Sequence, residues 1–455
     1  MRGRRTMPNR ISRDMSRLAT MAERLVALPP PGNAARRMIE HSFIDILGCV
    51  LSGNRHPEAG RLHHVARDLG SGSAAVYGTR LRLAAPQAAF VNATASHLEE
   101  FDDWEEPGNT HPSAVIWPAI WALASLRPIG GGTALTAYAA GFEAITRLGE
   151  ALNFDHYNRG WHSTATLGIV GAAVACGHVL GFDRHRLAAA IGLALTQGSG
   201  YAAQFGSVVK PMQAGFASRD GLSSALMAEA GLEGQDAILD GPRGFAALLA
   251  GTDMGRLDDA IDAIDGSALD RWGVITKLYP TCSYTHRLAD CAVALHHRIA
   301  PAGIAAIEAE LPDFHYAILA YDRPQSAMQA RFSLPFVIAT CLVHGDLQLT
   351  HLEDPAGDRK VWDCLERVQV IPTTPRRPLM NYDPDQPDSL RVTLSTGEVV
   401  EERRAYPTGS LQAPASRERI LAKFAGLAAP IGVHPGLEGW ATAGDLATCL
   451  QEVTQ

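Results

Sequence analysis

Apolar residues recur every three to four positions over most of the first 265 residues, which is the spacing of an amphipathic helix. The pattern predicts helices over 22–28, 34–51, 86–100, 113–126, 133–152, 164–180, 183–197 and 218–230. Asp183 follows Gly181 as an N-cap follows the end of the preceding helix. Several of these segments are rich in alanine and glycine on every side, so we expect them to pack at the centre of a bundle.

The pattern changes after about residue 265. Short apolar runs at 368–371, 390–394 and 399–402 are typical of strands, and residues 395–398 form a hairpin-type turn between the last two. Helical spacing persists at 285–299 and 332–343 and returns at 417–428 and 442–453. The sequence therefore predicts a mainly α protein, with a large helical domain at 1–267, a smaller inserted α+β domain at 268–403, and C-terminal helices at 404–455 that return to the first domain.

Composition narrows the classes of protein. Of 455 residues, 46% are hydrophobic and 19% are charged, a scarcity of polar surface that favours an oligomer. The net charge of 40 − 48 = −8 argues against a nucleic-acid partner, which requires a basic stripe. No apolar run is long enough for a membrane helix, and the basic N-terminus, which we expect to be disordered, lacks the apolar region of a secretion signal.

Sequence signatures of common cofactors are missing. Seven cysteines, widely spaced and without a CxxC pair, indicate a reducing, cytoplasmic setting rather than a disulfide framework, a zinc site or an iron–sulfur cluster. Neither GxSxG nor GxxxxGK[ST] occurs, which disfavours a serine hydrolase and a P-loop enzyme.

Residue types that carry chemistry gather in five segments. They are 97–106 followed by His111, 160–164 with His162, 210–215 with Lys210, 277–287 with Lys277, and 321–333 with Arg331. Taken singly, each has an ordinary explanation: a solvated acidic loop, a histidine that caps a helix, or surface ion pairs. Taken together, they could form a cationic pocket for carboxylates, with arginine making forked contacts and lysine acting as a point charge.

Segments along nearly the whole chain resemble the MmgE/PrpD family. They are DILG at 45–48, AAFVN at 88–92, His97, Asp102-Asp103, His111-Pro112, GWH at 160–162, Lys210-Pro211, KLYP at 277–280, ARFS at 330–333 and Lys423-Phe424. The resemblance implies an all-helical domain with a smaller α+β lid, usually in a homodimer, an active site between the two, and catalysis without any metal or other cofactor. By this resemblance, the functional positions of the family correspond here to Asp102, Asp103, His111, His162, Lys210 and Lys277.

That family includes 2-methylcitrate dehydratase, cis-aconitate decarboxylase and iminodisuccinate epimerase. The sequence departs from its pattern twice. The link from Asp103 to His111 looks longer than in the decarboxylases, and Cys282 stands where those enzymes resemble Lys-x-x-Pro-x-His. The missing imidazole disfavours decarboxylation, and residues 281–286 look closer to the epimerase.

The activities of the family share a proton transfer at a carbon next to a carboxylate, which concentrates negative charge on the substrate. We assign Lys210, Lys277 and Arg331 to stabilise that charge in a site with little water. His111 and His162 are the candidate general acids and bases, because free imidazole titrates near neutrality. Tyr284 joins the catalytic set on condition that a neighbouring cation activates its hydroxyl.

The substrate-binding set comprises Asp102, Asp103, Cys282, His286 and Arg331. The two aspartates are better suited to orient His111 or a lysine than to meet an anion directly, because like charges repel. The expected substrate is a small polycarboxylate. Dehydration of a 2-methylcitrate-like compound ranks first, epimerisation of an iminodisuccinate-like compound second, and decarboxylation of a cis-aconitate-like compound third.

Two other classes of protein stay open. Asp102, Asp103 and Glu106 on a helical scaffold also suggest a magnesium-dependent, terpene-synthase-like enzyme. The second metal motif of such enzymes fits poorly, because Ala228 stands where an acid is needed. The chain could also be an inactive helical scaffold that binds ligands without turnover.

Overall fold

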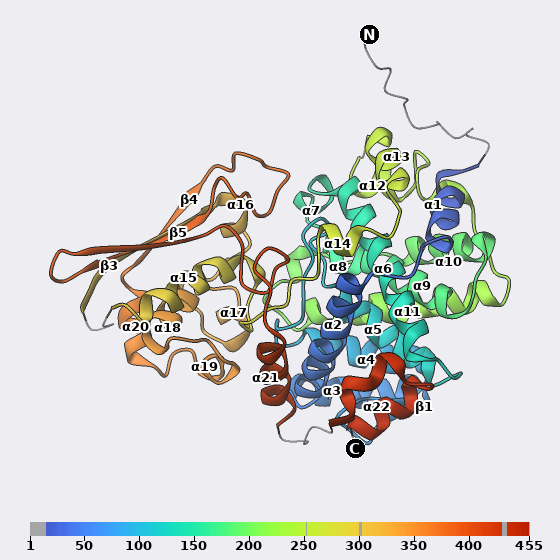
Figure 1. Ribbon diagram of the computed structural model, residues 1–455, viewed down its shortest axis with the longest axis horizontal. Coiled ribbons are helices and arrows are strands. Elements are labelled where there is room, and N and C mark those ends of the chain that lie inside the picture. Colours follow the sequence, from blue (N-terminus) through green and yellow to red (C-terminus); the bar gives the residue numbers. More distant parts are fainter. Residues whose placement is uncertain (1–14, 252, 300–302, 430–434, 455) are drawn as a thin grey trace, which may run out of the picture.

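The computed structural model describes residues 15–251, 253–299, 303–429 and 435–454, and it is mostly helical with a small sheet (Figure 1). Its longer helices are α1 (Arg17–Val26), α2 (Asn33–Gly53), α3 (Pro57–Leu69), α4 (Ala85–His97), α5 (Pro112–Ala124), α6 (Gly131–Leu152), α9 (Gly168–Val179), α10 (Arg184–Gln197), α11 (Val209–Glu229), α13 (Met254–Asp262), α15 (His286–His296), α18 (Leu334–His344), α21 (Arg417–Ala428) and α22 (Leu446–Thr454). Shorter helices are α7 (Asp155–Asn158), α8 (Ser163–Thr166), α12 (Phe245–Leu249), α14 (Ala268–Arg271), α16 (Asp313–Tyr316), α17 (Ala327–Ala330), α19 (Leu349–Glu353) and α20 (Arg359–Leu365). Among the described residues, no helix is both long and apolar enough to cross a membrane.

Six strands complete the fold. A small hairpin, β1 (Ser71–Ala75) with β2 (Arg82–Leu83), lies between α3 and α4. The main sheet has the order β4 (Val368–Thr373), β3 (Ile304–Pro312), β5 (Asp388–Leu394) and β6 (Val399–Arg404). Strand β3 pairs in parallel with β4 and antiparallel with β5, and β5 and β6 form the expected hairpin, with Gly397 at φ +86° in its turn.

Glycines let the central helices approach one another closely. A Cβ atom on Gly141 of α6 would lie 2.6 Å from the backbone oxygen of Gly171 of α9. A Cβ atom on Gly221 of α11 would lie 2.7 Å from the backbone oxygen of Ile169. The expected packing of small-residue helices at the centre of the bundle is therefore confirmed at the two crossings of α9 with α6 and α11.

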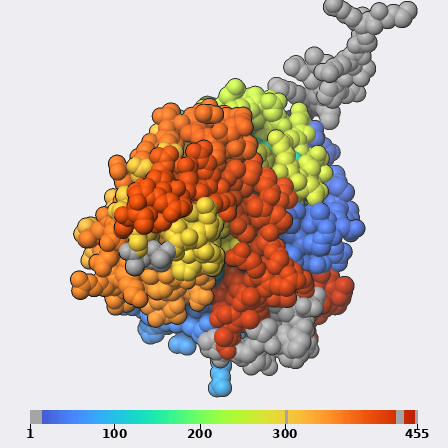
Figure 2. All heavy atoms as spheres, turned by 60° about the vertical axis from the view of Figure 1, so that its left-hand side comes forward, coloured from blue at the N-terminus to red at the C-terminus, as the bar shows by residue number. Residues whose placement is uncertain are grey.

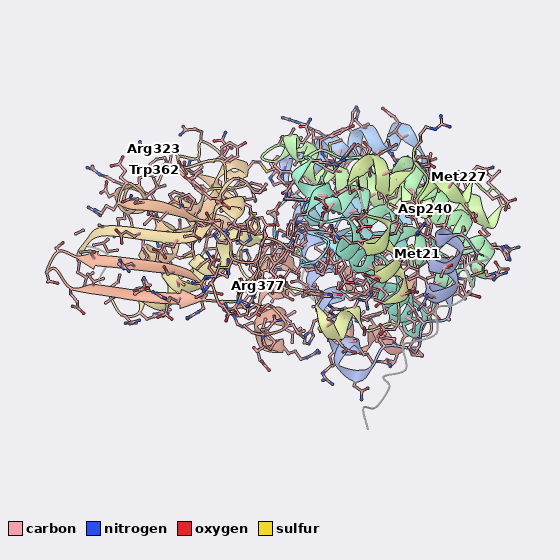
Figure 3. All side chains as sticks on the ribbon, turned by 90° about the horizontal axis from the view of Figure 1, so that it is seen from above. Met21, Met227, Asp240, Arg323, Trp362 and Arg377 are labelled. Atoms are coloured by element: carbon pink, nitrogen blue, oxygen red, sulfur yellow. The ribbon has the colours of Figure 1, made fainter. Side chains whose placement is uncertain are left out.

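Buried apolar side chains form two cores. The first joins helices α1 to α6 and α9 to α14 with α21 and α22, and the second lies around the main sheet and covers residues 275–392 together with Trp104. Seen from above, Arg323 and Trp362 lie on the sheet unit, Met21 and Met227 lie on the helical unit, and Arg377 lies between them (Figure 3). Figure 2 shows the C-terminal residues, in red, beside both the orange sheet unit and the blue N-terminal helices. The domain boundaries at 267 and 403 stay a prediction.

Several elements differ from the sequence-based expectations. Helices α3, α13 and α20 and the hairpin of β1 and β2 were not expected. The helix expected at 218–230 begins at Val209, because Pro211 in its first turn needs no backbone N–H partner. The helix expected at 164–180 is broken at Leu167 into α8 and α9. Strand β3, at the centre of the sheet, was not expected, because its sequence IAAIEAELP is rich in residues that favour helices.

Candidate active site

A cavity lies where the two units meet. It has an empty volume of about 370 Å³. The helical unit and its loops contribute Glu100, Trp104, Asn109, His111, Tyr157, His162, Phe205 and Lys210, and the sheet unit contributes Cys282, Ser283, Tyr284, Ile318 and Phe332. Four of the five expected catalytic residues, His111, His162, Lys210 and Tyr284, thus line one cavity, together with Cys282 of the expected binding set.

Glu100 joins the two expected catalytic lysines. It follows the last turn of α4 with φ at +52°, a backbone conformation that side-chain-bearing residues rarely adopt. Its carboxylate forms an ion pair with Lys210 Nζ, and Lys277 Nζ lies 3.0 Å from Oε1 and 3.1 Å from the Glu100 backbone oxygen. Burial alone would raise the pKa of Glu100, but Lys210 and Lys277 hold it well below its usual range. The three groups thus form a buried ionic cluster, and of the two lysines Lys210 lines the cavity.

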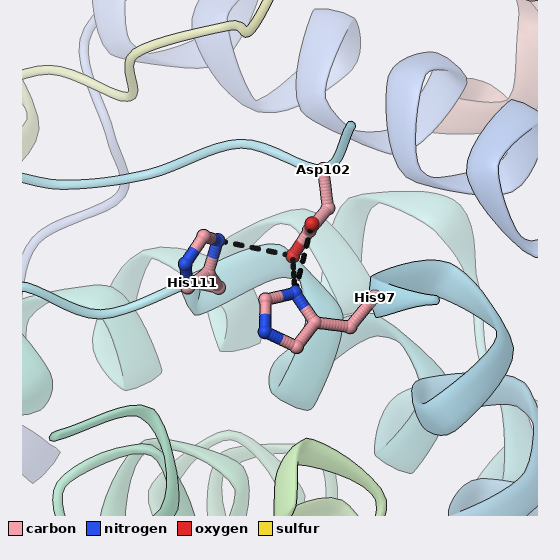
Figure 4. A group of neighbouring side chains, drawn as sticks. All are labelled: His97, Asp102 and His111. Carbon is pink, nitrogen blue, oxygen red and sulfur yellow. Dashed lines mark hydrogen bonds and ion pairs between the residues drawn. The ribbon is translucent and has the colours of Figure 1, made fainter. Parts of the chain in front are cut away.

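Asp102 is shared by two histidines (Figure 4). His97 Nδ1 lies 2.8 Å from Asp102 Oδ2, and His111 Nδ1 lies 3.1 Å from the same oxygen and 2.8 Å from the backbone oxygen of Asp103. His97 Nε2 in turn lies 3.0 Å from Lys210 Nζ. Burial would raise the pKa of Asp102, but the two imidazoles that face it hold the pKa well below its usual range. Asp102 contacts both histidines and does not line the cavity, and its role in orienting them stays a prediction.

These bonds fix where the proton sits on each ring. A backbone or carboxylate oxygen only accepts hydrogen bonds, so His111 Nδ1 carries the proton and its Nε2 keeps a lone pair. That Nε2 atom lies 3.8 Å from Glu100 Oε1, beyond hydrogen-bond length. Burial lowers the pKa of His111 to about 3, against the pull of Asp102, so the ring is a neutral base at pH 7. The expectation that His111 titrates near neutrality is corrected by its burial.

His162 has the same arrangement. Gln213 Nε2 donates to the backbone oxygen of Tyr201 at 3.2 Å, which turns Gln213 Oε1 towards His162 Nδ1 at 2.8 Å. An amide oxygen only accepts, so Nδ1 is protonated and Nε2 is the free nitrogen. Burial, reinforced by Lys210, lowers the pKa of His162 well below its usual value. His162 is the N-cap residue of α8, but its side chain makes no capping bond, so the simple capping explanation fails.

Within the described part of the chain, His97, Asp102 and His111 form the one group of such side chains close enough together to hold a metal ion. The group offers two imidazole nitrogens and one carboxylate, whereas Mg²⁺ prefers oxygen ligands. Asp103 points elsewhere, since its carboxylate binds the Ser113 hydroxyl and, at 3.2 Å, the Ser113 backbone N–H at the start of α5. The donor set therefore fits a hydrogen-bonded network better than a magnesium site.

The Tyr284 hydroxyl lies beside two side-chain amides, those of Asn381 and Asn109. It donates to Asn381 Oδ1 at 2.9 Å and lies 3.4 Å from Asn109 Oδ1. Burial raises the pKa of Tyr284 well above its usual value. These contacts do not include the cation that would activate Tyr284, so the hydroxyl is protonated and its catalytic role stays a prediction. Burial also raises the pKa of Cys282 to about 11, so its sulfur faces the cavity as a thiol.

Five of the expected site residues do not line the cavity: Lys277 and, from the expected binding set, Asp102, Asp103, His286 and Arg331. Lys277 bonds the cavity-lining residue Glu100 but does not line the cavity itself. Arg331 Nε donates to the backbone oxygen of Glu99 at 3.0 Å, and His286 Nε2 lies 3.3 Å from the backbone oxygen of Thr281. The structure thus gives Arg331 and His286 backbone partners and does not bring them into the cavity lining.

Sequence reasoning missed four site residues: His97, Glu100, Asn109 and Gln213. His97 and Glu100 belong to the acidic segment noted above, but their spacing does not show that both would meet Lys210, more than 100 residues later. Gln213 follows Lys210 by three residues, so a helix beginning at Val209 would have placed both on the same face. Asn109 gave no signal in the sequence.

Comparisons with known proteins identify the family of the chain. Residues 16–256 match the MmgE/PrpD N-terminal domain and residues 279–435 match the MmgE/PrpD C-terminal domain. The chain belongs to the MmgE/PrpD family. It is 25% identical over 421 residues to a cis-aconitate decarboxylase of Aspergillus terreus, covering 86% of this chain and 84% of that protein. It is also 28% identical over 364 residues to the cis-aconitate decarboxylase of Homo sapiens, covering 76% and 73%, respectively. These relatives are enzymes of the lyase class.

Proposed function

We propose that this member of the MmgE/PrpD family is a lyase that removes water from a small hydroxylated di- or tricarboxylate of the 2-methylcitrate type, without a metal or other cofactor. One observation carries the proposal: two neutral imidazoles, His111 and His162, line one cavity with Nδ1 protonated and Nε2 free. A base of this kind is what the removal of a proton from carbon requires.

In the proposed reaction, one free Nε2 atom takes the proton from the carbon next to a carboxylate. A carbon–carbon double bond forms as the carbon–oxygen bond breaks, and the hydroxyl leaves as water with a proton from Lys210 Nζ. The Glu100 carboxylate and the His97 ring hold Lys210 in place for this transfer. Apolar walls such as Phe205 and Phe332 exclude water, which strengthens the attraction between Lys210 and the developing negative charge.

Decarboxylation of a cis-aconitate-like compound is the second candidate, and it is favoured by the names of the relatives. It differs from dehydration in the proton transfer at carbon. The carboxylate leaves as carbon dioxide, and the carbon left behind must then receive a proton from an acid. Lys210 could supply this proton as well as the one that dehydration needs, so the acid does not separate the two reactions. Burial holds both imidazoles neutral in the free protein, and dehydration uses such a base on carbon whereas decarboxylation does not. That is the reason for ranking dehydration first.

The deciding experiment is ¹H NMR of the EDTA-treated protein in D₂O with citrate, 2-methylcitrate, cis-aconitate, malate and the iminodisuccinate stereoisomers. We expect an unsaturated product and deuterium at the carbon next to a carboxylate in the recovered substrate. Release of carbon dioxide from cis-aconitate would replace dehydration by decarboxylation, and exchange with inversion alone would indicate an epimerase. No exchange and no turnover with any compound would refute the proposal.

Two variants test the assigned residues. His162→Ala and Lys210→Ala should fold normally and lose most of the activity. The control is His178→Ala, which removes another largely buried histidine whose Nε2 bonds the backbone oxygen of Leu25 in the helical core. Near-parent activity in either site variant would show that the reacting groups lie elsewhere. The expected homodimer stays a prediction, and sedimentation of the full chain would test it.

A further inference from the structure

Two polar groups on the Tyr284 side of the cavity have no hydrogen-bond partner within the described structure. They are Asn109 Nδ2 and Ser283 Oγ, in side chains that are 5% and 6% exposed. Buried polar groups are nearly always hydrogen-bonded, because leaving one unpaired costs about 1–3 kcal/mol. Both residues line the cavity, so the partner they lack is one that the cavity would hold.

The surrounding bonds settle which atom of Asn109 is the free one. Asn381 Nδ2 donates to the backbone oxygen of Glu106 at 2.9 Å, so this atom is a nitrogen and presents hydrogens. It also lies 2.9 Å from Asn109, and the Asn109 atom that faces it must therefore be the oxygen. The amide nitrogen of Asn109 is left over, with both of its hydrogens. Asn109 holds this position with φ at +53°, a conformation that asparagine tolerates better than most residues.

In the part of the chain described, no arginine lines the cavity, and the nearby Arg287 lies behind its wall in an ion pair with Asp388. Lys210 is the cationic residue among the lining side chains, and it is paired with Glu100. The bonds behind Asn109 lead through Asn381 to the backbone oxygen of Glu106, so none of these partners carries a positive charge. A second carboxylate bound here would be buried without an opposite charge, which is costly, whereas a neutral oxygen needs only the hydrogen-bond donors that are present.

We infer that Asn109 and Ser283 form a second subsite, which binds a neutral oxygen of the substrate: a hydroxyl or carbonyl oxygen rather than a carboxylate. The inference rests on the proposed function, since it takes the cavity to be the substrate site. It also narrows the substrate class, because in cis-aconitate every oxygen belongs to a carboxylate, whereas a hydroxy acid carries the neutral oxygen that this subsite accepts.

Three pairs of ligands that differ by one oxygen test the subsite: citrate with propane-1,2,3-tricarboxylate, malate with succinate, and 2-oxoglutarate with glutarate. Affinities are measured by titration calorimetry on the full chain. We expect the oxygenated member of at least one pair to bind about three- to tenfold more tightly, the range of one or two hydrogen bonds between uncharged groups. No preference in any of the pairs, including the absence of binding, would overturn the subsite.

The variants assign the preference to these two residues. Ser283→Ala should abolish it without lowering the melting temperature, because Oγ has no partner to lose. Asn109→Asp keeps the oxygen that faces Asn381 and the unusual backbone conformation but replaces the free donor by an acceptor, so it should also abolish the preference. The control is Ser218→Ala in α11, which removes another buried hydroxyl without a partner, away from the cavity lining. A preference that survives in Ser283→Ala and Asn109→Asp would refute the assignment.

These tests distinguish a failure of the subsite from a failure of the lyase proposal. If no compound exchanges deuterium but the oxygenated ligands still bind more tightly in the parent, the lyase proposal fails and the subsite stands. If turnover occurs and the ligand pairs bind equally, the subsite fails and the lyase proposal stands.

Discussion

Replacing Gln213 by methionine should remove most of the activity while leaving the cavity intact. Gln213 is only 4% exposed and does not line the cavity, but its Oε1 atom lies 2.8 Å from His162 Nδ1. Methionine has a similar length and shape and no oxygen. The proton on Nδ1 then has no acceptor, and moving it to Nε2 destroys the free nitrogen that faces the substrate.

The size of the effect follows from that lost bond. A buried N–H without an acceptor costs about 1–3 kcal/mol, so the second tautomer becomes favoured by up to that amount. Since 1.36 kcal/mol is a factor of ten, kcat should fall between about 5-fold and 150-fold. KM should change little, because Gln213 has no contact with the cavity. The other bond of Gln213, to the backbone oxygen of Tyr201, is replaced by water because Tyr201 is 54% exposed.

Gln213→Glu provides the counterpart. Its carboxylate accepts from Nδ1, so the tautomer is kept, and its charge raises the pKa of His162. The neutral imidazole is the base, so activity should be near that of the parent at high pH and fall as the pH drops through the raised pKa. Steady-state kinetics from pH 5 to 9 on the parent and both variants measure this. The control is Gln197→Met, because Gln197 Nε2 also bonds a buried group, the Ser224 hydroxyl, although Gln197 itself is exposed at the end of α10. Parent-like kcat in Gln213→Met would refute the tautomer argument.

Three further predictions concern stability and the residues behind the wall. Arg331→Met should leave kcat and KM within about threefold of the parent and lower the free energy of unfolding by about 1–3 kcal/mol, because it leaves a buried backbone oxygen unpaired; a large loss of kcat would restore Arg331 to the active site. Burial raises the pKa of Glu105 to about 7, above its unfolded value of 4.5, so its protonated form stabilises the fold below pH 4.5 and that stability is lost as the pH rises through 7. Glu105→Gln should therefore flatten the pH dependence of urea unfolding in that window by up to about 3 kcal/mol, and an unchanged slope would contradict the shift. Lys423 Nζ lies 2.7 Å from the buried carboxylate of Asp45, so Lys423→Met should cost about 3–5 kcal/mol, and adding Asp45→Asn should recover part of it in chemical denaturation, whereas additive losses would count against the pair.

Sequence patterns determined much of the helical part of the fold. Helices α2, α4, α5, α6 and α10 lie within a few residues of their predicted bounds, and the Asp183 side chain caps α10 as expected by accepting from the backbone N–H groups of residues 185 and 186. Periodicity suffices in these segments because each buries one continuous face in a local bundle. The hairpin of β5 and β6 is also local, since its turn residues set the pairing.

Strand β3 and the site needed the tertiary structure. The alanines and glutamates of β3 favour a helix, and the segment is extended because β4 and β5 bond to both of its edges. The sequence supplied His111, His162, Lys210 and Cys282 as candidates, but it could not show that burial lowers the pKa of His111. Protonation, tautomers and free donors depend on which groups meet in space, and groups such as Lys210 and Glu100, which lie 110 residues apart, meet only after the chain has folded.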